Sequence, residues 1–186
     1  MSEKLEDYKT DGNKEVIELC KKGNSKGQLK LYELYSKSMF NVCLRMMKTR
    51  EEAEDVLQES FVEIFKHIDS FRYDSTIGAW IKKIVINRCI NALKKKSLDI
   101  EYKDNNSLPD KPETNTDESE WINMTVDKIK KAVSELSEGY RVIFSLYVFE
   151  GYDHAEISEV LGISESTSKS QYLRAKRRIA ELLQKN

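Results

Sequence analysis

The sequence has few of the residues that interrupt helices. Its 186 residues include only two prolines and seven glycines, whereas 34% are charged and 39% are apolar. This composition predicts a largely helical protein with enough apolar side chains to build cores. No apolar run is long enough to cross a bilayer, and the charged N-terminus does not resemble a signal peptide. We therefore expect a cytoplasmic protein without membrane insertion.

Cysteine and histidine are also scarce, which argues against metal and catalytic chemistry. The three cysteines, Cys20, Cys43 and Cys89, lie far apart among apolar residues, and the sequence has no C-x-x-C pair. We expect reduced, buried thiols and no metal site. The two histidines, His67 and His154, are isolated on predicted helices, and the sequence has no Gly-rich phosphate loop or nucleophile constellation. It therefore predicts neither an enzyme nor a cofactor.

The charges nearly cancel, since 31 basic and 32 acidic residues leave a formal net charge of −1. A simple non-specific DNA-binding protein would be more basic, because DNA affinity depends largely on contacts with phosphates. Near-neutrality fits better with charge that is segregated on separate surfaces. We therefore expect an acidic surface and a basic surface that meet different partners.

Apolar periodicity predicts an all-α protein of two small helical domains joined by a flexible acidic linker. A flexible N-terminus (1–12) precedes a first domain at residues 13–96. Its helices are expected at about 14–22, 26–47, 50–68 and 77–96. Gly23 and Gly27 are expected to bracket the first break, and Leu29 and Tyr32 to face the core.

The linker is expected at residues 97–120, which hold both prolines and many acidic side chains. Such a segment cannot bury enough apolar surface to fold. The second domain is expected at residues 121–186, and it begins with helices at about 121–136 and 138–149.

A helix-turn-helix pattern occupies residues 151–178. Asp153 can cap a first helix with Glu156 completing a capping box, and Gly162 follows the last apolar residue of that helix. Ser164 can cap a second helix, whose outer face carries short polar and cationic side chains. Such a helix can enter the major groove of DNA. A Gly-containing turn also joins helices in proteins of other functions, so the turn alone leaves DNA binding open.

An acidic stripe follows one face of the helix expected at residues 50–68. Its members recur at helical spacing and are Asp55, Gln58, Glu59 and Val62. A stripe of this kind is often only a solvated surface. The exposed apolar atoms beside it favour a contact with another protein.

Aromatic residues and an arginine share the loop before the last helix of the first domain. Phe71, Arg72 and Tyr73 lie in this loop, and the basic helix that follows ends in three lysines at residues 94–96. Aromatic faces and cations are what unstacked bases and their phosphates require. A core aromatic pair beside a helix with a basic C-terminus explains the same pattern. Both interpretations stay open at this point.

Three motifs follow one another in the chain: D-V-L-Q-E-S-F at residues 55–61, S-T-I-G-A-W-I-K-K-I-V-I-N at residues 75–87, and a C-terminal set within residues 136–178. The C-terminal set comprises E-G-Y, E-I-S, L-G-I-S and T-S-K-S. Together they resemble the motifs of bacterial sigma-70 factors of the extracytoplasmic function group. The resemblance covers nearly the whole chain. It implies an RNA polymerase sigma factor that directs promoter recognition and DNA melting.

The resemblance also implies partners and a role for each motif. The partners would be the RNA polymerase core (its β′ clamp helices and β flap), promoter DNA and an anti-sigma factor, and the linker would thread toward the RNA exit channel. The residues binding core polymerase would be Asp55, Gln58, Glu59 and Val62. The residues melting and holding the minus-10 element would be Phe71, Arg72, Tyr73, Trp80, Lys83, Asn87, Arg88 and Asn91. The residues reading the minus-35 element would be Ser166, Thr167, Lys169, Ser170, Leu173, Arg174 and Arg177.

Four residues depart from the family's pattern. Ile77 replaces a Phe, Asn91 an Asp, Ser137 a frequent Pro, and Ser168 an apolar Val of the recognition helix. The Ser168 replacement is expected to loosen packing unless its hydroxyl bonds back to a carbonyl. The departures leave the base preference at both promoter elements open.

A stand-alone helix-turn-helix regulator is the alternative interpretation. In that case the N-terminal half would sense a ligand or dimerise. The alternative explains residues 151–178 but not the motif at residues 55–61.

Overall fold

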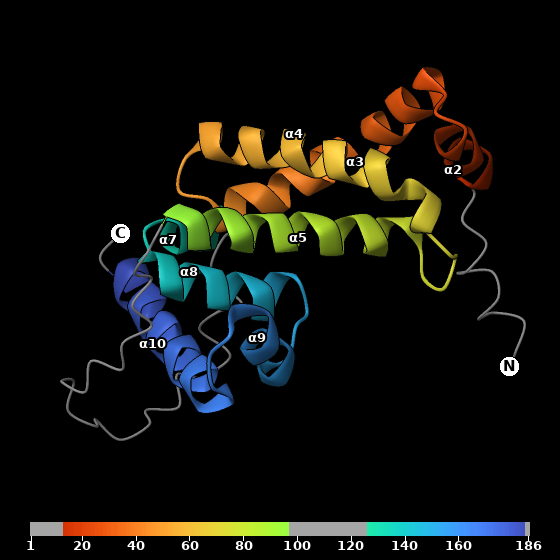
Figure 1. Cartoon of the computed structure of the whole chain (residues 1–186). Coiled ribbons are helices and arrows are strands. Elements are labelled where there is room, and N and C mark those ends of the chain that lie inside the picture. The colour runs from red at the N-terminus through yellow and green to blue at the C-terminus, as the bar shows by residue number, and fades with distance from the viewer. Residues whose placement is uncertain (1–12, 97–125, 185–186) are drawn as a thin grey trace, which may run out of the picture. The chain divides into compact units, whose positions relative to one another are not determined.

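The computed structural model describes residues 13–96 and 126–184, and the chain divides into two compact units, residues 1–97 and 98–186 (Figure 1). Each unit is described here by itself. Every element among the described residues is a helix, which confirms the all-α prediction. The predicted flexible N-terminus and acidic linker lie outside the described residues. None of the described helices is both long and apolar enough to span a membrane.

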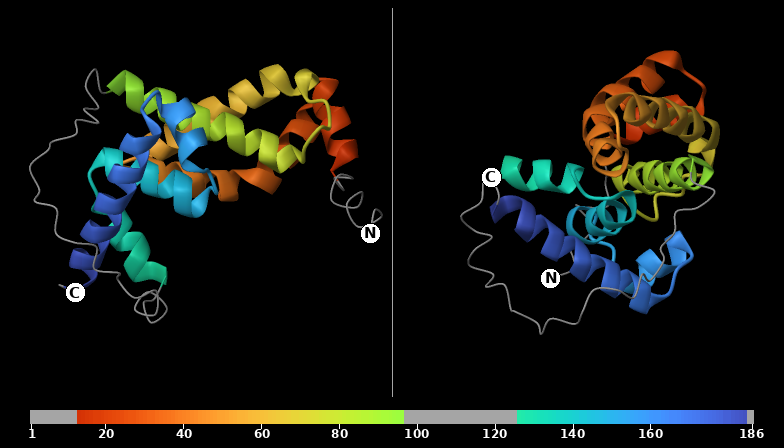
Figure 2. Two further views of the ribbon diagram at one scale, coloured as in Figure 1. Left: turned by 90° about the horizontal axis from the view of Figure 1, so that it is seen from below. Right: turned by 90° about the vertical axis from the view of Figure 1, so that its left-hand side faces the viewer.

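The first unit is a bundle of three long helices with a short helix at one end. Its elements are α2 (Lys14–Lys21), α3 (Ser25–Met46), α4 (Arg50–His67), the 3-10 turn η1 (Ile68–Ser70) and α5 (Ile77–Lys96). Helices α3, α4 and α5 contact one another in pairs and lie side by side in Figures 1 and 2, while α2 packs on α3 and η1. All three cysteines are buried free thiols, as predicted.

Local sequence sets the start of α4. The Thr49 hydroxyl accepts a hydrogen bond from the Glu52 backbone N–H at 3.2 Å, and the Glu52 carboxylate accepts one from the Thr49 N–H at 3.3 Å. This is a capping box, which satisfies two backbone donors that the helix leaves without intrahelical partners. The register of the acidic stripe along α4 follows from this start.

The break between α2 and α3 differs from the prediction. Gly27 does not bracket it, because Gly27 is buried inside α3, which begins at Ser25. A Cβ atom on Gly27 would lie 2.6 Å from the Leu19 Cβ, so only glycine permits this approach of the two helices.

The close packing of α2 against Gly27 also decides which face of α3 is buried. Gly27 and Leu31, one turn apart, both face the core. The prediction that Leu29 and Tyr32 face the core was therefore wrong: their exposed fractions are 59% and 38%. Apolar periodicity alone could not decide between two neighbouring apolar faces of one helix.

The second unit comprises α7 (Val126–Ser134), α8 (Glu138–Phe144), the π-helix η2 (Ser145–Phe149), α9 (His154–Leu161) and α10 (Glu165–Gln184). Helix α10 contacts α7, α8 and α9. The residues buried in this core cluster are Ala132, Val133, Leu136, Phe144, Ala175 and Ile179. The first turns of the helix predicted at 121–136 lie outside the described residues.

The helix predicted at residues 138–149 is not uniform, because its last turn is a π-helix. The Glu150 N–H donates to the Ser145 carbonyl, five residues earlier, at 3.2 Å, which is the hydrogen-bond spacing of a π-helix. Beyond the helix, the Tyr152 N–H donates to the Leu146 carbonyl at 3.0 Å. Phe149 then packs against the core, whereas Val148 is exposed. Apolar periodicity did not predict this wider turn.

Candidate protein and nucleic-acid interfaces

The acidic stripe lies on an exposed face of α4. Asp55, Gln58, Glu59 and Val62 are all exposed, and Val62 has an exposed fraction of 54%. The opposite face is buried and includes Phe61. The buried hydroxyl of Ser60 donates to the Val56 carbonyl at 2.6 Å, so this polar residue of the motif is satisfied inside the bundle. The structure thus presents all four predicted residues to solvent on one surface.

Arg88 joins α5 to this stripe. Its Nε forms an ion pair with Glu63, and its Nη1 lies 3.8 Å from the Glu59 Oε2. We predicted Arg88 as a DNA contact and Glu59 as a polymerase contact, and the structure places the two side chains against each other. Sequence reasoning missed Glu63, whose partner lies 25 residues away on another helix.

The remaining polar residues predicted on α5 share one exposed face. Lys83, Asn87 and Asn91 follow at four-residue spacing and are all exposed. Trp80, one turn before Lys83, is half-buried. Ile77, the departure from the family's Phe, is fully buried at the start of α5. The structure therefore groups a cation and two amides on one surface of α5, the helix that follows the aromatic loop.

The aromatic loop is built around Phe71. This ring is buried, with its centroid 4.9 Å from the Tyr73 ring and 5.5 Å from the Trp80 ring. Arg72 is exposed, and Tyr73 is half-buried. Each interpretation of the sequence therefore fits one part of the loop. Phe71 is a core aromatic residue, whereas Arg72 is exposed at the surface.

Helix α2 holds Tyr73 from the other side. The Tyr73 hydroxyl donates to the Glu18 Oε1 at 2.7 Å, and the Lys21 Nζ lies 4.7 Å from the centroid of the Tyr73 ring. The same Lys21 ammonium donates to the Phe71 carbonyl at 3.0 Å. The hydrogen bond from Tyr73 lowers the pKa of the Glu18 carboxyl, with a smaller contribution from Lys21. Sequence reasoning assigned no function to α2.

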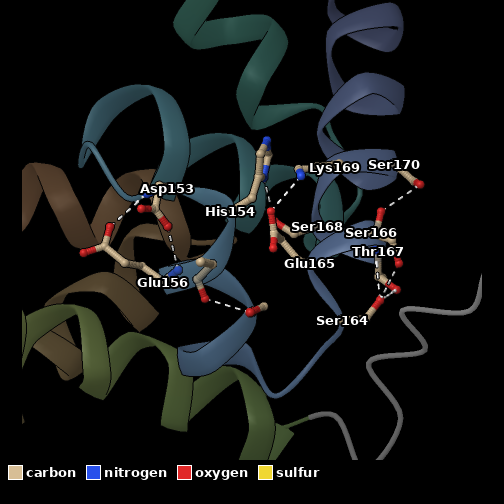
Figure 3. Close-up of polar contacts among 12 residues, drawn as sticks. Asp153, His154, Glu156, Ser164, Glu165, Ser166, Thr167, Ser168, Lys169 and Ser170 are labelled. Carbon is tan, nitrogen blue, oxygen red and sulfur yellow. Dashed lines mark hydrogen bonds and ion pairs between the residues drawn. The ribbon is translucent and has the colours of Figure 1, made fainter.

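The helix-turn-helix has the local signals that the sequence predicts (Figure 3). Asp153 and Glu156 form a capping box at the start of α9, and Gly162 ends it at a φ of 71°. The Ser164 hydroxyl accepts the Thr167 backbone N–H at 3.0 Å at the start of α10. The left-handed turn at Gly162 directs the chain from α9 into α10.

The predicted reading residues lie on the outer side of α10. Ser166, Lys169, Leu173 and Arg177 are exposed, and Thr167, Ser170 and Arg174 are half-buried. The Leu173 side chain, with 49% of its area exposed, is the large apolar member of this surface. Lys169 forms an ion pair with Glu165 at 2.6 Å, and because both side chains are exposed this pair contributes little to stability.

Ser168 faces the other way and is fully buried. Its hydroxyl oxygen lies 2.9 Å from the Nδ1 atom of His154 on α9, and Figure 3 shows the imidazole directed toward it. The Ser168 hydroxyl thus bonds to an imidazole and not to the carbonyl that we considered as its partner. The sequence shows His154 only as an isolated histidine on a helix, and no spacing rule links it to a serine in another helix.

His154 lies in an aromatic environment. Its ring stacks on Tyr147 at a centroid distance of 4.6 Å and meets Tyr172 edge to face at 5.7 Å. Burial and then the nearby Lys169 lower the pKa of His154, while Glu165 and Asp153 act in the opposite direction. Burial also raises the pKa of the Tyr172 phenol. Through its hydrogen bond to Ser168, the imidazole connects the two helices of the motif.

Metal binding has no support from the described residues, since they contain no group of three or more His, Cys, Asp or Glu placed to hold an ion.

Two family models match these units. The model of sigma-70 region 2 matches residues 31–98, and that of sigma-70 region 4 matches residues 127–179. The chain is also 32% identical over 134 residues to the RNA polymerase sigma factor SigZ of Bacillus subtilis, covering 70% of this chain and 72% of SigZ. This chain belongs to the sigma-70 family of RNA polymerase sigma factors.

Further relatives of this sigma factor carry the name of the extracytoplasmic function (ECF) group. This chain is 26% identical over 179 residues to the ECF sigma factor SigW of Bacillus subtilis, and the match covers 91% of this chain and 96% of SigW. The solved structure of the sigma factor RpoE with the anti-sigma factor NepR from Bartonella quintana is similar in fold. It has a TM-score of 0.53 and 22% identity, covering 83% of this chain and 95% of that chain.

The matches place this sigma factor in the ECF group and divide its candidate surfaces. The acidic stripe, the aromatic loop and α5 lie within the region 2 match, and α9 with most of α10 lies within the region 4 match. The alternative of a stand-alone helix-turn-helix regulator is not supported. It would require a sensing or dimerising N-terminal half, where the chain matches sigma-70 region 2.

Proposed function

We propose that this ECF sigma factor binds core RNA polymerase through α4 and promoter DNA through two other surfaces. The stripe of Asp55, Gln58, Glu59 and Val62 contacts the β′ clamp helices. Its exposure as one acidic face with an apolar member supports this role, because protein interfaces combine apolar contact with charge complementarity.

The aromatic loop and α5 hold the non-template strand of the minus-10 element. Arg72 and Tyr73 belong to the loop, and Lys83, Asn87 and Asn91 follow on the exposed face of α5. Unstacking costs a few kcal/mol per step, and stacking with pocket binding returns roughly 1–3 kcal/mol per base. Melting of this kind needs no catalytic residue, so the protein acts as an initiation factor and not as an enzyme.

The second unit reads the minus-35 duplex with α10. Ser166, Thr167, Lys169 and Ser170 lie in the first part of the helix, followed by Leu173, Arg174 and Arg177. Short hydroxyls, cations and one exposed apolar side chain are suited to base edges, phosphates and the thymine methyl group. Linking two weak DNA contacts raises the overall affinity, because the second binding step becomes intramolecular.

The separation of acidic and basic residues on different helices supports the assignment of polymerase to one surface and DNA to the others. A formal net charge of −1 is compatible with promoter binding when acidic α4 meets the polymerase and the outer faces of α5 and α10 meet DNA. The sigma factor would act in the cytoplasm with core polymerase. A protein related in function to NepR, the anti-sigma partner of Bartonella quintana RpoE, would regulate it.

Run-off transcription from a randomised promoter library tests the proposal. Purified core polymerase with this sigma factor should initiate at sequences that share two elements, whereas core polymerase alone should not. Selection of one duplex element that the protein binds equally well without polymerase would contradict the proposed division of roles.

A further inference from the structure

Tyr73 has an unusual backbone conformation for a residue with a side chain. Its φ of 62° lies in the left-handed region, and Tyr73 is the only non-glycine among the described residues with a positive φ. A bulky L-residue adopts this conformation at a cost and keeps it only where surrounding contacts determine it. The contacts that hold Tyr73 therefore define the shape of the loop that precedes α5.

These contacts come from one face of α2. Glu18 and Lys21 lie one helical turn apart and interact with each other at 3.8 Å. Glu18 accepts the Tyr73 hydroxyl, while Lys21 covers the Tyr73 ring and binds the Phe71 carbonyl. The loop is thus attached to α2 by a hydroxyl, a ring face and a backbone oxygen. Tyr73 and Glu18 are 55 residues apart in sequence, so no local rule produces this arrangement.

The attachment has consequences for DNA binding. Lys21 occupies one face of the Tyr73 ring, and the Phe71 ring lies against Tyr73 as well, which limits where a base can stack. The carbonyl of Phe71 is already engaged. A loop held in one shape offers a smaller set of positions to an unstacked base, and preorganisation lowers the ordering cost of binding.

We propose that Glu18 and Lys21 are positioning residues for the minus-10 loop, setting both its affinity for the unstacked strand and its base preference. Helix α2 lies before residues 31–98, which the region 2 model matches. The inference rests on the proposed function, since it requires that the loop holds the non-template strand.

The test uses the full-length sigma factor bound to core polymerase and labelled single-stranded oligonucleotides carrying the minus-10 element, with each base substituted in turn. Glu18→Ala removes the acceptor, Tyr73→Phe removes the donor, and Glu18→Gln keeps a neutral acceptor. Glu15→Ala, on the same helix and exposed, is the matched control.

Glu18→Ala and Tyr73→Phe should each weaken binding of the preferred strand about tenfold, the effect of losing one charge-assisted hydrogen bond. They should also reduce discrimination at one base position, and Glu18→Gln should restore much of both. The double variant should lose no more than either single variant, because both remove the same contact. Core polymerase binding and minus-35 duplex binding should stay unchanged.

A parallel variant, Lys83→Gln, separates the two proposals. If Lys83→Gln weakens strand binding while Glu18→Ala changes neither affinity nor base preference, the positioning role is wrong and the proposed function stands. If the wild-type holoenzyme binds all strands alike and Lys83→Gln has no effect, the proposed minus-10 surface is wrong and the positioning role is overturned with it.

Discussion

The imidazole Nδ1 of His154 and the hydroxyl oxygen of Ser168 lie 2.9 Å apart, joining α9 to the buried side of α10. This hydrogen bond allows a serine where the family's pattern has valine. The pair is enclosed by aromatic rings, since Tyr147 stacks on His154 and Tyr172 meets it edge to face. The packing of α10 against α9 in this protein therefore includes a buried polar contact at Ser168.

Ser168→Ala should destabilise the second unit by about 1 kcal/mol, because it leaves the half-buried imidazole without this partner. Native-state hydrogen exchange of the intact protein can measure the free energy of opening across residues 126–184. Ser166→Ala, on the exposed side of the same helix, is the control. Equal protection from hydrogen exchange in Ser168→Ala and Ser166→Ala would show that the hydrogen bond between Ser168 and His154 adds nothing to stability.

Acidification should also weaken the second unit through His154. Its pKa is lowered from 6.5 in the folded protein, so the unfolded chain binds the proton first as pH falls. The contribution is complete above pH 6.5 and is lost as pH falls from there through the folded pKa. The stability of residues 126–184, measured by hydrogen exchange corrected for its intrinsic pH dependence, should decline more steeply in wild type than in His154→Gln. His67→Gln should follow wild type, and parallel curves for wild type and His154→Gln would refute the effect.

Arg88→Gln should destabilise the first unit by roughly 0.5–1 kcal/mol, because Arg88 joins α5 to Glu63 and Glu59 on α4 in a partly exposed ion-pair network. Lys83→Gln, an equal change of charge on the exposed face of α5, should leave stability unchanged. Urea denaturation followed by the α-helical circular dichroism signal of both variants makes the comparison. If Arg88→Gln is as stable as wild type but binds the minus-10 strand less well, Arg88 acts on DNA and not between helices.

Gln58→Ala combined with Glu59→Lys should abolish binding to core polymerase and leave the fold intact. The Glu59 carboxylate lies near Arg88, so Glu59→Gln with Gln58→Ala is the companion variant that avoids placing two cations together. Co-purification with core polymerase and circular dichroism separate binding from folding. Normal co-purification of both double variants would mean that the stripe is only a solvated surface.

Arg174→Ala should weaken binding of the minus-35 duplex by about 1–3 kcal/mol, the usual effect of removing an arginine that contacts a base. Arg178→Ala is the matched control, because Arg178 is exposed on the same helix and pairs with Glu181 at 2.8 Å. Fluorescence anisotropy at a fixed salt concentration gives both affinities. Equal losses in the two variants would indicate a general charge effect and move the reading face elsewhere on α10.

The candidate surfaces were predictable where residues of one helix act together. Asp55, Gln58 and Glu59 share a face because helical geometry puts residues three and four apart on one side. The same rule places Lys83, Asn87 and Asn91 together. It could not show that Arg88 turns toward Glu63, that Glu18 binds Tyr73, or that Leu31 is covered in place of Leu29. These outcomes depend on which helices meet.

The sequence by itself determined where α4 and α9 begin and where α9 ends, since these signals act within one turn. The capping boxes at Thr49 and Asp153 and the left-handed Gly162 satisfy backbone groups with neighbours in the chain. Only the tertiary structure decided the partners of Arg88, His154 and Tyr73. Their contacts join residues 25, 14 and 55 positions apart. Such pairs form only after apolar burial has brought the helices together, and nothing in local spacing encodes which side chains then meet.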